Sequence, residues 1–115
     1  MEHRIVIQIR DNLFALLDGG LSLWKLTNLI DGKISKEDLA IPLKSRKDPS
    51  VTTFNQRFLF VTGGIGLNNV DYYDTAVNQW THAPAMMAER SSHSSCCLKG
   101  KLYVFGGEDR DGTKY

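Results

Sequence analysis

Short apolar segments recur along the chain at a nearly constant spacing. Residues 12–18, 57–62 and 101–105 are rich in Leu, Phe and Val, and a glycine pair directly follows each of them. The pairs are Gly19-Gly20, Gly63-Gly64 and Gly106-Gly107, which lie 44 and 43 residues apart. Such apolar runs, bounded by turn residues, are typical of strands covered on both faces. The pattern therefore indicates an internal repeat with one buried strand in each unit.

Each buried segment is preceded by another predicted strand, at residues 5–10, 51–54 and 93–98, after which a short polar turn reverses the chain. The middle unit continues with a predicted strand at 69–74, a turn at 74–78 and a short strand at 79–81, before Pro84 ends regular structure. Four short antiparallel strands in about 40–50 residues are typical of one β-propeller blade.

Residues 48–115 resemble the kelch repeat. In that family a hydrophobic strand ends in a glycine pair, followed by Tyr-Asp, a Trp seven residues after the Tyr, a Pro-Met stretch, and then Arg and His-Ser. The corresponding residues here are Gly63-Gly64, Tyr73-Asp74, Trp80, Pro84, Met86, Arg90, His93-Ser94 and Gly106-Gly107. The resemblance implies an all-β fold, an incomplete β-propeller of about 2.5 four-stranded antiparallel blades.

The first unit departs from this pattern. Lys36 stands at the position that corresponds to Trp80, and Trp24 follows Gly19 too closely to replace it. The stretch 33–50 is long, charged and contains two prolines. Either an insertion separates two strands, or residues 1–47 form a diverged kelch-like blade, which we favour. We then expect a kelch blade at 48–89 and the first two strands of a further blade at 90–115.

Composition and charge narrow the class of protein. The chain has 115 residues, is 42% hydrophobic, and carries 14 Lys and Arg against 13 Asp and Glu, a net charge of +1. This balance argues against an electrostatic nucleic-acid binder. The apolar run 5–9 is too short to cross a bilayer, no secretory signal is evident, and Cys96-Cys97 are not a disulfide framework. We therefore expect a cytoplasmic protein without nucleic-acid or membrane partners.

A closed propeller needs about four to eight blades, more than this sequence contains. We therefore expect a fragment, and if the chain is really this short we expect its uncovered blade faces to promote self-association.

The residue patterns of common catalytic and metal sites do not occur. His3, His82 and His93 have no metal-binding spacing, and there is no Cys-x-x-Cys, Gly-x-Ser-x-Gly or phosphate-binding loop. We therefore predict no catalytic residue, no metal, no cofactor and no enzymatic activity. The alternative is a fragment of a kelch-type enzyme, such as a copper oxidase or a sugar-processing propeller, and a remnant without function is a third possibility.

The resemblance implies a protein-protein interaction module, which binds a partner protein or peptide through its loops as part of a substrate-recognition or scaffold protein. The implied partner contacts are Arg90, Ser91, Gly66, Asn68, Asn69, Asp109 and Arg110. The implied structural residues are Gly19, Gly20, Gly63, Gly64, Tyr73, Asp74, Trp80, Gly106 and Gly107. For Arg90 the other interpretation is a structural bond to the neighbouring blade.

Overall fold

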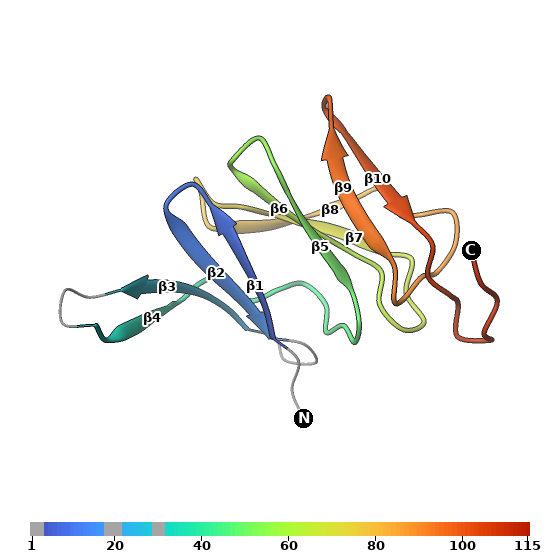
Figure 1. Ribbon diagram of the computed structural model, residues 1–115, viewed down its shortest axis with the longest axis horizontal. Coiled ribbons are helices and arrows are strands. Elements are labelled where there is room, and N and C mark those ends of the chain that lie inside the picture. The colour runs from blue at the N-terminus through green and yellow to red at the C-terminus, as the bar shows by residue number, and fades with distance from the viewer. Residues whose placement is uncertain (1–3, 18–21, 29–31) are drawn as a thin grey trace.

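The computed structural model describes residues 4–17, 22–28 and 32–115, which form ten strands (Figure 1). Within these ranges no helix has the length and apolarity needed to cross a membrane. The strands are β1 Arg4–Ile9, β2 Asn12–Leu17, β3 Leu23–Asn28, β4 Ile34–Asp38, β5 Ser50–Phe54, β6 Phe58–Thr62, β7 Val70–Asp74, β8 Gln79–Ala83, β9 Ser94–Leu98 and β10 Lys101–Phe105.

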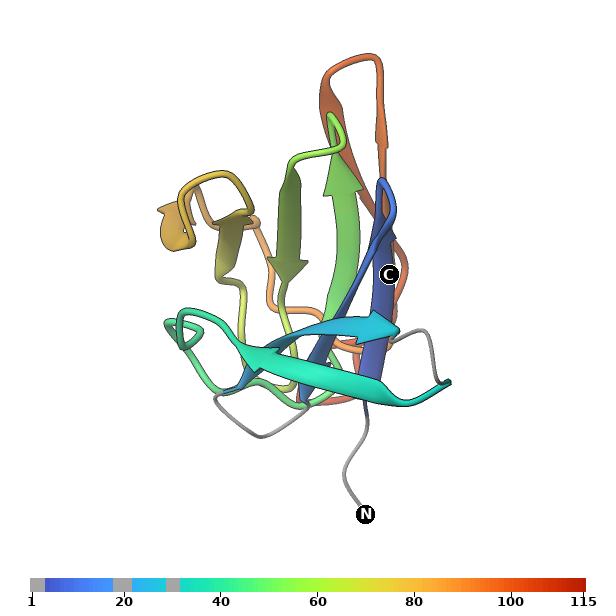
Figure 2. The same cartoon turned by 90° about the vertical axis from the view of Figure 1, so that its left-hand side faces the viewer.

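The strands form three antiparallel units. The sheet orders are β1-β2-β3-β4 and β5-β6-β7-β8, and β9 pairs with β10. The first strands β1, β5 and β9 lie next to one another, so the units fan out from a common inner side (Figure 1). Each four-stranded sheet twists, and the cyan and teal outer strands β3 and β4 cross the direction of β1 in Figure 2. The prediction of an all-β, incomplete propeller is confirmed.

The first unit is a four-stranded sheet, in the order β1-β2-β3-β4. Its fourth strand, β4, had no hydrophobic signal because all five of its side chains are exposed. In the second sheet Leu59 pairs with Tyr73, which pairs with Trp80. In the first sheet Ala15, 44 residues before Leu59, pairs with Trp24, which pairs with Asp38, so the register places Asp38 and not Lys36 at the position that corresponds to Trp80. Lys36 pairs with Leu26, and its ammonium group lies 4.0 Å from the centre of the Trp24 ring.

The core lies between the first two sheets. Its buried members are Ile9, Phe14, Leu16 and Leu23 from the first sheet, with Leu59, Val61 and Tyr73 from the second. Trp80 packs against this cluster, and its indole Nε1 donates to the carbonyl oxygen of Ala40 at 2.9 Å. The indole thereby attaches the second sheet to the connection between β4 and β5.

Gly63 and Gly107 make room for His93 between two consecutive glycine pairs. A Cβ at Gly63 would overlap the Arg90 carbonyl oxygen and lie 2.9 Å from His93 Cε1. A Cβ at Gly107 would lie 2.5 Å from the Ser91 carbonyl oxygen and 2.8 Å from His93 Cβ. Both glycines also have positive φ, a conformation that side chains disfavour. The pairs thus let residues 90–93 pass close to both loops.

The His93 imidazole is half-buried between these loops. Its Nε2 lies 2.8 Å from Thr62 Oγ1, while its buried Nδ1 has no hydrogen-bond partner among the described residues. Burial lowers the pKa of His93 below its ordinary value of 6.5, the bond to Thr62 opposes this, and the Arg90 charge lowers it further. The folded state therefore holds His93 in its neutral form more strongly than the unfolded chain does.

Gly63→Ala should destabilise the fold more than Gly100→Ala. Both residues have positive φ, which costs an L-residue about 1–2 kcal/mol, but a Cβ at Gly100 meets no atom within 4 Å. At Gly63 the new methyl group must also displace backbone at Arg90. Urea denaturation followed by circular dichroism measures both losses, and equal losses would show that the close approach is unimportant.

Stability should fall as the pH drops below 6.5, partly through His93. Its folded pKa is lowered, so in this range the unfolded state binds the proton first and is favoured. The Asp74 carboxyl, whose pKa the hydrogen bonds from Arg57 hold below 3.8, loses its contribution only in more acidic solution. His93→Gln should flatten the stability profile between about pH 7.5 and pH 5. An unchanged slope in this variant contradicts the assignment.

Candidate functional site

The loops that contain most of the predicted contact residues gather at one end of the strands. The turns β1–β2, β5–β6 and β9–β10 point upward in Figure 1, and the loops 63–69, 84–93 and 106–115 lie at the opposite end. We call these three loops together the loop surface. It joins the second unit to the third, because residues 84–93 connect β8 to β9.

Backbone hydrogen bonds hold the loop surface together. The Met86 N–H donates to the Asn68 carbonyl oxygen at 2.8 Å, and the Arg90 N–H donates to that of Leu67 at 3.1 Å. Ser91 and Glu108 exchange two bonds of 2.9 and 3.0 Å. The loops from two consecutive units therefore form one ordered surface, since each is bonded to the next.

Arg90 and Ser91 connect neighbouring units. Arg90 Nη1 donates to the carbonyl oxygen of Gly106 at 2.8 Å, and its guanidinium lies 4.5 Å from the centre of the Tyr115 ring. Ser91 is 7% exposed and pairs with Glu108 through its backbone. The Arg90 side chain thus bonds within residues 90–115, while its backbone bonds to Leu67 and Gly64 of the second unit. The burial of Ser91 leaves its side chain little access to a partner.

The other predicted contacts divide into turn formers and exposed side chains. Gly66 adopts a φ of +74°, and the Asn69 carbonyl oxygen accepts the Gly63 N–H at 2.9 Å. The Asp109 carboxylate accepts backbone N–H groups of residues 111 and 113, both at 2.9 Å, and so shapes its own turn. Asn68 and Arg110 are exposed.

Three further side chains complete the outer face of the loop surface. Glu89 Oε1 lies 3.2 Å from Arg110 Nε and bridges two of the loops. Ile65 is 57% exposed and Met87 is fully exposed on the same loops. Sequence analysis did not single out Glu89 and Met87, because an isolated side chain in a loop has no periodic signal.

Arg46 is the principal structural residue that sequence analysis missed. Its side chain is 5% exposed and donates to the carbonyl oxygens of Gly63 and Asn69, at 2.6 and 2.9 Å. It also forms a 2.8 Å ion pair with Asp71, whose other carboxylate oxygen lies 2.6 Å from His82 Nδ1. One available signal was its position 44 residues before Arg90, which matches the repeat.

The remaining motif residues have structural contacts. Tyr73 is 1% exposed, and its hydroxyl donates to Asn78 Oδ1 at 2.6 Å. Burial raises the pKa of Tyr73 to about 12, and the charges of Glu37 and Asp74 add to this. The Asp74 carboxylate accepts two 2.8 Å hydrogen bonds from Arg57. Gly19 and Gly20 lie outside the described residues.

The two cysteines face different surroundings. Cys96 is exposed and Cys97 is half-buried, where burial raises the pKa of its thiol and keeps it protonated. Among the residues described, no group of three or more His, Cys, Asp or Glu side chains is placed to hold a metal ion.

Comparisons with known proteins agree with the repeat and the fold. The kelch motif model matches residues 89–114. Kelch-like protein 21 of Danio rerio is 40% identical over 57 residues, 46% of this chain and 9% of the relative. Kelch-like protein 25 of Homo sapiens is 38% identical over 79 residues, 64% of this chain and 13% of the relative. The chain thus matches only about a tenth of the length of these relatives.

A solved structure shows the same fold. The structure titled "Structure of YjhT" superposes with a TM-score of 0.77 at 23% identity, over 96% of this chain and 35% of that one. The blade topology, the glycine pairs and the motif match lead to one conclusion. The chain contains a kelch motif at residues 89–114, is similar to kelch-like proteins, and has the fold of part of a kelch-type β-propeller.

Proposed function

We propose that this chain is part of a protein-binding propeller and that a partner protein or peptide contacts its loop surface. The observation that carries the proposal is the bonding between loops of two consecutive units, which leaves Ile65, Met87 and Arg110 exposed on one ordered surface. Loops held by a rigid strand scaffold are common binding elements.

The exposed side chains are of types that suit a protein interface. Methionine and arginine are enriched in such interfaces, and buried apolar contacts surrounded by polar groups are their usual arrangement. Arg110 Nη1 lies 4.0 Å from the position that a Cβ would take at Gly66, so its charge stands beside the neighbouring loop. Because the backbone is already hydrogen-bonded, binding would cost little additional ordering of the loops.

The proposed role is binding without catalysis. The charged groups on this surface pair with one another, Arg110 with Glu89 at 3.2 Å and Lys114 with Glu108 at 3.6 Å. Such pairs suit electrostatic complementarity with a partner.

Met87→Asp and Arg110→Glu should each weaken partner binding by about tenfold or more, because loss of a hot-spot side chain costs about 2 kcal/mol or more and tenfold corresponds to about 1.4 kcal/mol. Val77→Asp is the matched control, since Val77 is 53% exposed on the opposite, turn side. Affinity purification with the tagged chain and quantitative mass spectrometry identifies the partners, and interferometry measures their affinity. Circular dichroism confirms that the variants fold. Partners retained equally by all three variants would contradict the proposal.

A further inference from the structure

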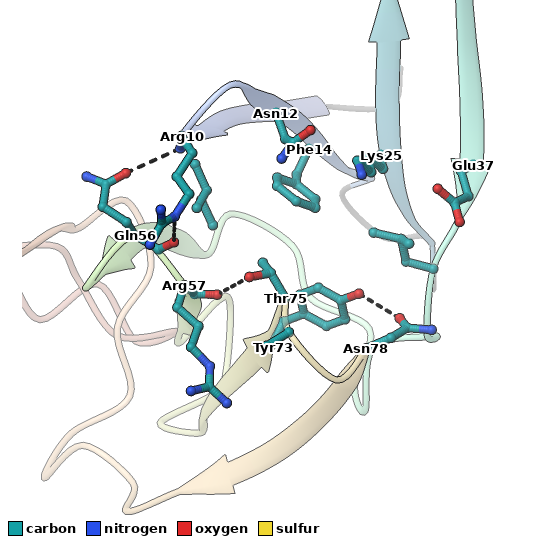
Figure 3. Close-up of a pocket in the computed structure, with 13 residues that line it drawn as sticks. Arg10, Asn12, Phe14, Lys25, Glu37, Gln56, Arg57, Tyr73, Thr75 and Asn78 are labelled. Atoms are coloured by element: carbon teal, nitrogen blue, oxygen red, sulfur yellow. Dashed lines mark hydrogen bonds between the residues drawn. The ribbon is translucent and has the colours of Figure 1, made fainter.

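A cavity of about 420 Å³ lies between the first and second sheets, away from the loop surface (Figure 3). Its wall includes the β1–β2 turn at Arg10, the β5–β6 turn at Gln56 and the β7–β8 turn at Ala76. Every residue in its described lining belongs to these two complete sheets or to their connections. The cavity is therefore defined without any further blade.

The inner wall of the cavity is apolar. Ile9, Phe14 and Tyr73 line it and are 3%, 4% and 1% exposed, and half-buried Leu39 adds a further apolar side chain. Figure 3 shows the Phe14 and Tyr73 rings from the two sheets on either side of the space. The volume lies within the range of about 300–1,000 Å³ that is typical of ligand sites. The rest of the lining is mostly polar, so the cavity combines an apolar inner wall with many polar groups.

Cationic groups stand at the rim. Arg10 Nε donates to the Gln56 carbonyl oxygen at 3.2 Å, while its two Nη groups make no hydrogen bond to the residues described. Lys25 lines the same cavity and has no ion-pair partner in the described part of the chain. The Arg57 guanidinium, by contrast, donates two 2.8 Å hydrogen bonds to the Asp74 carboxylate.

Glu37, the acidic residue of the lining, lies at a distance from Arg10. Figure 3 shows Glu37 on the side of the cavity away from Arg10, with Phe14 and Lys25 between them. Lys25 stands directly opposite Glu37 in the β3–β4 register, so this end of the cavity has a cation beside its acceptor, while the Arg10 end has donors. A peptide segment offers both a carboxylate and backbone N–H groups, so its polarity can match both ends.

We propose that this cavity binds a short acidic peptide segment of a partner protein, with an apolar side chain against Phe14 and the adjacent carboxylate on Arg10. The guanidinium of Arg10 is already held in place by Gln56, and its remaining N–H groups can grip a carboxylate in bidentate fashion. Glu37 accepts backbone N–H groups of the same segment. The site is separate from the loop surface and does not depend on the proposed function.

The test is a nuclear magnetic resonance titration of the 115-residue chain with two probes, N-acetyl-Phe-Glu-amide and N-acetyl-Phe-Gln-amide. The Glu probe should shift signals around Arg10, Gln56 and Ala76, and it should bind about tenfold more tightly than the Gln probe, since a charge-assisted bond is lost. Shifts confined to other regions, equal affinities, or no shifts at all would overturn the proposal.

Variants separate the site from simple charge attraction. Arg10→Gln keeps an N–H that can reach the Gln56 carbonyl oxygen but removes the positive charge, and should abolish the preference for the Glu probe. Lys101→Gln is the matched control, because Lys101 is exposed on β10 and does not line the cavity. If both variants reduce the preference equally, the effect is one of net charge and the proposal fails. Met87→Asp and Arg110→Glu should leave it unchanged, which distinguishes this site from the loop surface.

Discussion

The loop surface depends on one buried cation. The Arg46 guanidinium cannot lose its proton, so once it is removed from water each of its donors needs an acceptor. It finds them in the Gly63 carbonyl, the Asn69 carbonyl and the Asp71 carboxylate. Such a pair contributes little net stability compared with apolar packing, but losing one partner is costly. The conformation of the 63–69 loop is therefore coupled to the connection between β4 and β5, from which Arg46 comes.

The same contact recurs one unit later. Arg90 donates to the carbonyl oxygen of Gly106, as Arg46 does to that of Gly63, and the two arginines are 44 residues apart. The sequence repeat is thus also a repeat of a bond from an arginine to the carbonyl oxygen of the first glycine in a glycine pair. Arginine suits this position because its planar guanidinium has several N–H donors, so it can bond to one carbonyl and also contact a second group. The Arg46 guanidinium also forms an ion pair with Asp71, whereas the Arg90 guanidinium lies over the ring of Tyr115.

Much of the fold could be predicted from the sequence, because glycine pairs and apolar runs mark strand ends and buried strands directly. The second unit was predicted to within two residues of β5, β6, β7 and β8. β4 was missed because every one of its side chains is exposed, so it has no apolar pattern. Arg46 could not be recognised from its neighbours, since its acceptors lie 17 to 25 residues later. The exposed loop residues and the cavity depend on how two units sit against each other, which no local pattern encodes.

The interface between the first two sheets has different contacts at the loop end and at the turn end. At the loop end Arg46 and the Ile65 N–H, which donates to the Lys47 carbonyl oxygen at 2.8 Å, bind the connection tightly to the second sheet. At the turn end Arg10 meets Gln56 only at the tip of each hairpin, above the apolar wall formed by Phe14 and Tyr73. The cavity lies beside that contact. A propeller seam that closes at one end and stays open at the other can position its loops firmly and still admit a ligand.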